Sequence, residues 1–127
     1  MKKEPLFIYC ARGIDHVIMA IWSINSLKNF NYNNIQVIVG KQKEKLFFNN
    51  YLPEVKCNII KVDLINYKMW AWRPFALSKL EIKDQSQIVI CDTDIIWHKD
   101  PKTLLTRFNN KPWVHKITSL DPGEFFD

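Results

Sequence analysis

Two aspartates one residue apart, Asp92 and Asp94, are the residues of this sequence best suited to do chemistry. They follow Gln87–Cys91, a mostly apolar run rich in β-branched residues, which is typical of a buried strand in a parallel sheet. Aspartate is a poor strand former and is costly to bury without a partner. Because Mg²⁺ and Mn²⁺ prefer oxygen ligands, the pair predicts a divalent-cation site where this strand ends.

A structural interpretation of these acidic residues stays open beside the metal site. Asp92 and Asp94 could simply end a strand and cap the turn that follows it. Asp100, directly before Pro101, is interpreted as a helix cap rather than as a ligand. His98 and His115 could be imagined as ligands, but the sequence favours a solvated turn for the first and an edge strand for the second.

Composition describes a soluble globular chain with one hydrophobic core. Of its 127 residues, 47% are hydrophobic and 24% are charged. The net charge of +5 favours anionic ligands such as nucleotides, and it would also suit an acidic membrane surface. The lysines are scattered and accompany no RNA-recognition or helix-turn-helix signature, so nucleic acid is not an expected partner.

The apolar stretches of the sequence are too short to cross a membrane, and this bears on cellular location. All of them fall far short of the roughly 20 residues that a transmembrane helix needs. Lysines after Met1 are similar to the start of a signal peptide, but Arg12, Asp15 and His16 interrupt its apolar core. We therefore expect a cytoplasmic protein. Cys10, Cys57 and Cys91 are widely spaced and lie in predicted strands, which favours reduced buried thiols over disulfides or a zinc site.

Strand and helix patterns alternate along the chain. Strands are predicted at Leu6–Ala11, Ile35–Val39, Val55–Val62, at the run before Asp92 and at Trp113–Thr118. Helices are predicted at Ile14–Phe30, with Asp15 as a cap, and at Glu44–Leu52, Phe75–Ile82 and Lys102–Phe108. This order predicts an α/β fold with a Rossmann-like parallel sheet, flanking helices and right-handed crossovers.

Large aromatic side chains need a place in this fold. Trp22 lies in the apolar pattern of the first helix and is predicted to belong to the core. Trp70, Trp72 and Phe75 could stack on a sugar or a base, but we favour packing against the sheet because tryptophan contributes much buried area.

The order of motifs around the aspartates resembles the Asp-x-Asp region of GT-A fold glycosyltransferases. An apolar strand, Asp92-Thr93-Asp94, an apolar pair and Asp100-Pro101 precede a short helix with Leu104 and Leu105. Upstream, the helix before the strand carries Arg73, Leu77, Lys79 and Leu80, and basic residues often occur there in that family.

This resemblance implies a nucleotide-sugar donor, with a UDP-sugar favoured, and Mn²⁺ or Mg²⁺ as cofactor. Asp94 would ligate the metal directly, Asp92 would reach the ribose or a metal-bound water, and Thr93 would offer backbone contacts. Other expected donor contacts come from the end of the first strand and from three basic residues: Cys10, Ala11, Arg12, Gly13, Arg73 and Lys79. The pocket would lie between the first and fourth strands, if the strand order is 3-2-1-4.

Family members usually run well beyond this chain, so residues 1–127 are expected to be one nucleotide-sugar-binding domain from the amino-terminal part of a longer enzyme. The acceptor, whether glycan, lipid-linked or protein, is open, and peripheral association with a membrane is compatible. Two alternatives remain. One is a non-catalytic nucleotide-binding or interaction fragment. The other is a haloacid-dehalogenase-type phosphotransferase, which also uses Asp-x-Asp with Mg²⁺ but normally carries it after the first strand.

Overall fold

A computed structural model of the chain describes residues 4–61, 69–80 and 87–107. The predicted strand at Trp113–Thr118 and the positions of Trp70 and His115 side chains lie outside this description. The elements in chain order are β1 (Leu6–Ala11), α1 (Ile14–Lys28), β2 (Ile35–Val39), α2 (Gln42–Tyr51), β3 (Lys56–Ile59), α3 (Met69–Ser78), β4 (Ile88–Cys91) and α4 (Lys102–Arg107). In the described residues, no helix has the length and apolar character needed to cross a membrane.

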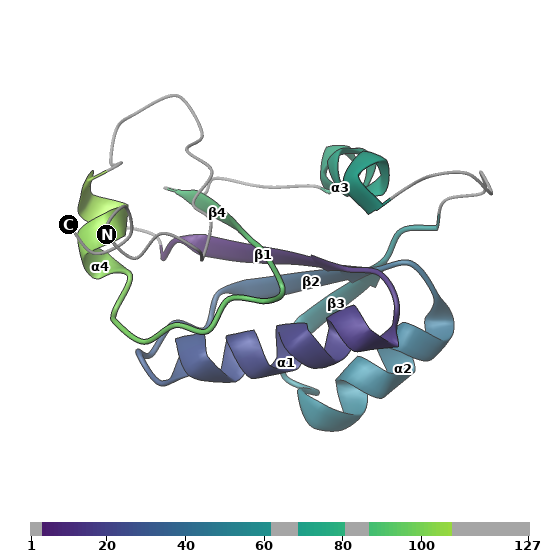
Figure 1. Cartoon of the computed structure of the whole chain (residues 1–127), viewed down its shortest axis with the longest axis horizontal. Helices are drawn as coiled ribbons and strands as arrows, with labels where there is room; N and C mark the ends of the chain where they lie inside the picture. The colour runs from purple at the N-terminus through teal and green to yellow at the C-terminus, as the bar shows by residue number, and fades with distance from the viewer. Residues whose placement is uncertain (1–3, 62–68, 81–86, 108–127) are drawn as a thin grey trace.

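The four strands form one parallel sheet in the order β3-β2-β1-β4 (Figure 1). This order confirms the predicted α/β fold with a parallel sheet, and it meets the 3-2-1-4 condition set for a pocket between the first and fourth strands. The chain moves outward from β1 to β2 and β3, and then returns to the other side of β1 to form β4. Two neighbouring strands, β1 and β4, are therefore the point at which the winding reverses, and open α/β sheets bind ligands at such a point.

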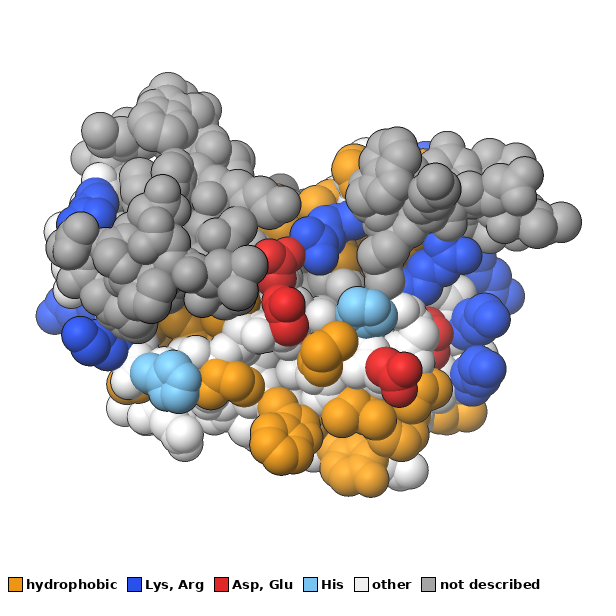
Figure 2. Space-filling view, in the orientation of Figure 1, with side chains coloured by type: hydrophobic (Ala, Val, Ile, Leu, Met, Phe, Trp, Pro, Cys, Tyr) orange, Lys and Arg blue, Asp and Glu red, His pale blue; other side chains and the backbone are white. Residues whose placement is uncertain are grey.

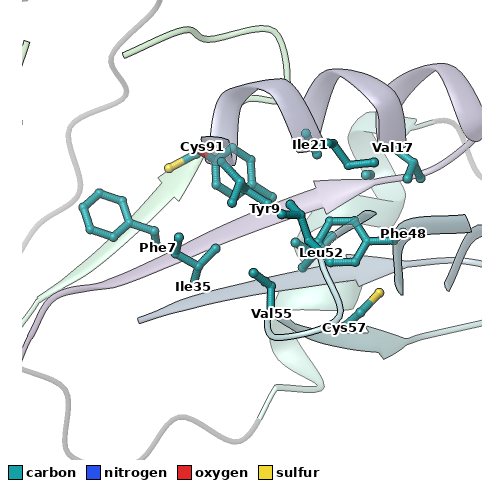
Figure 3. Packing of buried hydrophobic residues seen from close by; sticks show 14 of the residues in the cluster. Phe7, Tyr9, Val17, Ile21, Ile35, Phe48, Leu52, Val55, Cys57 and Cys91 are labelled. Atoms are coloured by element: carbon teal, nitrogen blue, oxygen red, sulfur yellow. The ribbon is translucent and has the colours of Figure 1, made fainter. Parts of the chain in front are cut away.

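Helices α1 and α2 cover one face of the sheet, and α3 lies on the other (Figure 1). Because successive side chains of a strand point to opposite faces, β1 serves both cores. Phe7 and Tyr9 pack under α1 and α2, whereas Ile8 and Cys10 pack with Trp72 of α3. Figure 3 shows the larger cluster, in which Tyr9, Val17, Phe48 and other side chains fill the space between strands and helices. The fully buried β1 is thus the centre of the molecule.

Polar side chains inside the larger cluster pair with one another. The Tyr9 hydroxyl lies 2.7 Å from the Ser23 hydroxyl and accepts a hydrogen bond from Trp97 Nε1 at 3.2 Å. The backbone N–H of Trp97 donates to the Ser26 hydroxyl at 2.8 Å. These bonds tie the segment after β4 to α1, and so they fix the position of the chain that follows the two aspartates.

Two predictions about burial were wrong. Trp22 is 69% exposed, because the buried stripe of α1 runs through Val17, Ile21 and Ile24 and position 22 lies outside it. Strand β4 is an edge strand of the described sheet and not a fully buried one: Ile88 and Ile90 are each about two-fifths exposed, at 43% and 41%. Its buried residue is Cys91, which faces α1.

Element boundaries differ from the predictions at several places. Helix α1 ends at Lys28 rather than at Phe30, α2 spans Gln42–Tyr51 rather than Glu44–Leu52, and β3 begins at Lys56 rather than at Val55. The helix predicted at Phe75–Ile82 is α3, which begins at Met69 and contains Pro74. Proline inside a helix removes one hydrogen bond and its ring crowds the preceding turn, but Trp72 anchors this turn by complete burial and by a 3.2 Å bond from Nε1 to the Ile60 carbonyl. This contact confirms that Trp72 is a packing residue. Gly13 takes the cap position of α1, so Asp15 is a first-turn residue and not the cap.

Candidate functional site

Most of the predicted site residues lie in or directly after two strands that end at the same edge of the sheet, and Arg73 and Lys79 come from α3 and the turn after it. Tyr9 of β1 pairs in register with Cys91 of β4. The residues that follow this pair, from Cys10 in the first strand and from Asp92 in the second, therefore leave the sheet at the same edge, although about 80 positions separate them in the sequence. In Figure 2, acidic and basic side chains meet with a histidine near the middle of this face. The structure thus brings together the two halves of the predicted site.

Asp92 forms an ion pair with Arg73 of α3. The Nη1 atom of Arg73 donates to Oδ1 of Asp92 at 2.8 Å, and the two side chains are 29% and 27% exposed. Arg73 Nε is buried and has no hydrogen-bond partner within the described part of the chain. Arg73 therefore lies beside Asp92, another of the predicted site residues, and its guanidinium retains capacity for a further acceptor.

Thr93 and Asp94 lie in different environments. The Thr93 side chain is buried, and its Oγ1 lies 3.2 Å from Nδ1 of His16 in the first turn of α1. Asp94 is exposed to solvent. Because Thr93 is held against α1, its side chain is committed to packing, while the carboxylate of Asp94 can reach a ligand in solution.

Glu44 fixes the turn between β1 and α1. Its side chain is 1% exposed, and its Oε2 accepts a 2.9 Å hydrogen bond from the Gly13 N–H. Oε1 accepts from the N–H groups of Gly40 and Lys41 at 2.9 and 3.0 Å. One carboxylate thus joins the ends of β1 and β2 at the start of α2, where the helix dipole also favours negative charge.

Gly13 has the backbone geometry that this turn needs. Its φ of 96° lies in a region that residues with a Cβ rarely adopt. Its carbonyl accepts the first hydrogen bond of α1, from the Val17 N–H at 3.0 Å. The Arg12–Gly13 turn is therefore held at both ends and presents backbone at the same edge as the aspartates.

Other predicted contacts are less direct. The side chains of Cys10 and Ala11 are buried in the two cores, so only their backbone could meet a donor. Lys79 lies just beyond α3, with Nζ 5.3 Å from the centre of the Phe75 ring, a cation–π contact. No hydrogen bond or ion pair among the described residues joins Lys79 to the aspartates.

The remaining polar predictions can be placed. Asp100 caps α4 as predicted, since its Oδ1 accepts from the Lys102 N–H at 2.9 Å. The same atom accepts from the Tyr32 hydroxyl at 2.8 Å. His98 is exposed, as expected of a solvated turn. Neither residue is brought to the aspartates by an observed contact.

The fit of a divalent cation depends on its other ligands. Within the described residues, no group of three or more metal-binding side chains occurs. Mg²⁺ commonly keeps several waters and binds through one or two carboxylates together with substrate phosphates. Asp92 and Asp94 supply the two carboxylates for such binding, but they are too few to hold an ion with protein ligands alone. The residues therefore fit an ion held jointly with a phosphate ligand.

The three cysteines are free and buried, as the sequence predicted. Burial raises the pKa of Cys10 and Cys57 to about 11 each and that of Cys91 to about 12. Neutral thiols of this kind are poor nucleophiles, which agrees with the expectation that Cys91 takes no covalent role.

Because the pKa values of these thiols are raised, we expect the protein to lose stability at alkaline pH. Their pKa values are raised above the usual value of 9.0, so their stabilising effect is complete below pH 9. It should be lost as pH rises from about 9 to about 12, because the unfolded chain releases its thiol protons first. Urea unfolding should give a lower midpoint at pH 10.5 than at pH 8. The triple alanine variant of the cysteines should show a smaller shift, and an equal shift would contradict the assignment.

Two residues at this edge were not predicted from the sequence. Glu44 was interpreted only as the start of a helix, and His16 only as a polar residue that interrupts an apolar stretch. Glu44 is an acidic residue in the first turn of a helix that begins just after a strand and Gly40, and this pattern could have indicated a capping role. No sequence signal links His16 to Thr93, because that contact depends on how α1 lies on the sheet.

Comparison of the chain with protein-family models, with curated proteins and with solved structures found no match.

Proposed function

We propose that this chain is a nucleotide-sugar-dependent, metal-dependent glycosyltransferase, or the donor-binding part of one. The observation that carries the proposal is the position of Asp92 and Asp94. They follow β4 at the carboxyl edge of a parallel sheet, beside the end of β1, where the winding reverses. The resemblance to the Asp-x-Asp region of GT-A fold enzymes supplies the substrate class.

Each residue at this edge has a role in the proposal. A divalent ion, when bound, neutralises the charge that grows on the diphosphate leaving group. Asp94 is the exposed carboxylate and would hold that ion, with Asp92 beside it. The Arg12–Gly13 turn, kept in shape by Glu44, would line the nucleotide pocket. Arg73 lies 2.8 Å from Asp92 and would contact the diphosphate through its planar guanidinium.

Nucleotide binding by the wild-type chain tests this proposal. Isothermal titration with UDP, GDP and CDP, each with and without Mn²⁺, should show that one nucleotide, UDP by preference, binds more tightly when Mn²⁺ is present. Saturation at about 100 times the dissociation constant should also stabilise the fold by roughly 2.7 kcal/mol. A folded chain that binds none of the three would contradict the donor-site assignment. Binding without any dependence on Mn²⁺ would favour a non-catalytic nucleotide-binding module.

A further inference from the structure

The ion pair between Arg73 and Asp92 links a helix on one face of the sheet to the end of strand β4. Only Nη1 of the guanidinium bonds to the carboxylate, at 2.8 Å. Nε is buried and makes no hydrogen bond within the described residues. The guanidinium also lies near Cys10 at the end of β1, where its charge lowers the pKa that burial of the thiol raises. Arg73 therefore bonds to Asp92 after β4, and its charge also acts on Cys10 of β1.

A cation at Asp92 would meet this positive charge. Two cations beside one carboxylate repel each other, and partial burial of the pair weakens the screening by solvent. A bound diphosphate reduces this repulsion because its negative charge attracts both the metal ion and the Arg73 guanidinium. Arginine binds phosphate oxygens through two parallel N–H donors, and Arg73 has donors that Asp92 does not occupy.

We propose that Arg73 is the internal counter-ion of Asp92 in the empty site and passes from the carboxylate to the diphosphate when a nucleotide binds with its metal. This inference rests on the proposed function. Arg73 then opposes binding of the metal alone and favours binding of the nucleotide with the metal. Because the metal ion and the nucleotide bind next to each other with opposite charges, each raises the affinity of the site for the other by the same factor. Removal of the Arg73 charge should therefore move the two affinities in opposite directions.

The test compares Arg73→Met with the wild-type chain. Electron paramagnetic resonance of free Mn²⁺ measures metal affinity without nucleotide, and isothermal titration measures UDP affinity in saturating Mn²⁺. Arg73→Met should bind Mn²⁺ alone about threefold more tightly, because a repelling charge is gone. It should bind UDP with Mn²⁺ about tenfold or more weakly, because charge-assisted bonds to phosphate are lost. Lys56→Met removes an exposed positive charge from the start of β3, at the opposite edge, and should change neither affinity.

A second variant keeps the inference testable if Arg73→Met does not fold. Arg73→Lys keeps the charge and loses the planar fork, so Mn²⁺ affinity should match the wild type while UDP affinity falls severalfold. Suppose that the wild type binds nucleotide and that Arg73→Met changes the Mn²⁺ and UDP affinities in the same direction or changes neither. That result overturns the counter-ion role and leaves the proposed function standing. A wild-type chain that binds no nucleotide overturns both.

Discussion

Glu44→Ala is expected to lower the free energy of unfolding by about 3–5 kcal/mol, since each of three backbone N–H groups loses its acceptor at about 1–3 kcal/mol per group and some regain water. The three donors belong to Gly13, Gly40 and Lys41, at 2.9, 2.9 and 3.0 Å. The side chain is 1% exposed, so its removal also leaves a cavity. Urea unfolding followed by circular dichroism measures the loss.

Glu44→Gln separates the hydrogen bonds from the packing. The amide oxygen can still accept from Gly40 and Lys41, but the amide nitrogen cannot accept from Gly13. The stability of this variant should therefore fall between those of the wild type and Glu44→Ala. Glu54→Gln is the matched control, because Glu54 is exposed and pairs with Lys28 away from the site. If Glu44→Gln were as stable as the wild type, the carboxylate would not hold the turn.

Asp94→Asn should reduce UDP affinity in saturating Mn²⁺ by about tenfold or more, because the carboxylate proposed to hold the metal loses its charge. Affinity without Mn²⁺ should stay within twofold of the wild type, because the predicted role of Asp94 is on the ion. The side chain is exposed, so stability should change by no more than about 0.5 kcal/mol. Isothermal titration in Mn²⁺ and in a chelator gives the two affinities.

The control for Asp94→Asn must remove an equal charge elsewhere. Glu54→Gln does so just before β3, at the amino edge of the sheet, and should leave UDP affinity unchanged in both conditions. An equal loss for Asp94→Asn with and without Mn²⁺ would show that the residue touches the nucleotide rather than the metal. That result would also reverse the roles predicted for Asp92 and Asp94.

Strong local patterns predicted the sheet well. Leu6–Ala11 and Ile35–Val39 are short apolar runs with clear ends, and the structure has strands with the same bounds. Alternation of strands and helices implied a parallel sheet. The 3-2-1-4 strand order was only the condition for a pocket between the first and fourth strands, and the structure meets that condition. Asp92 and Asp94 were found because acids at the end of an apolar strand stand out in the sequence.

Features that depend on packing were harder to predict. Trp22 is a residue type common in cores, but it lies outside the buried stripe of α1. The type of a side chain does not show which face of the helix that residue occupies. Met69–Ser78 contains a proline, which predicts a break, yet the helix continues through it, with Trp72 fully buried and bonded to the Ile60 carbonyl. Glu44 was missed because its three partners come from two strand ends that meet only in the folded chain.

Paramagnetic broadening by Mn²⁺ tests most directly whether the two aspartates hold a metal with a nucleotide. Two-dimensional amide spectra of the labelled chain with UDP would be compared in Mn²⁺ and in Mg²⁺. The signals of Gly13, Thr93 and Asp94 should broaden most, and those of Asn34 and Lys56 at the opposite edge should broaden least. Broadening centred away from the ends of β1 and β4, or spread evenly over the chain, would contradict the proposed site.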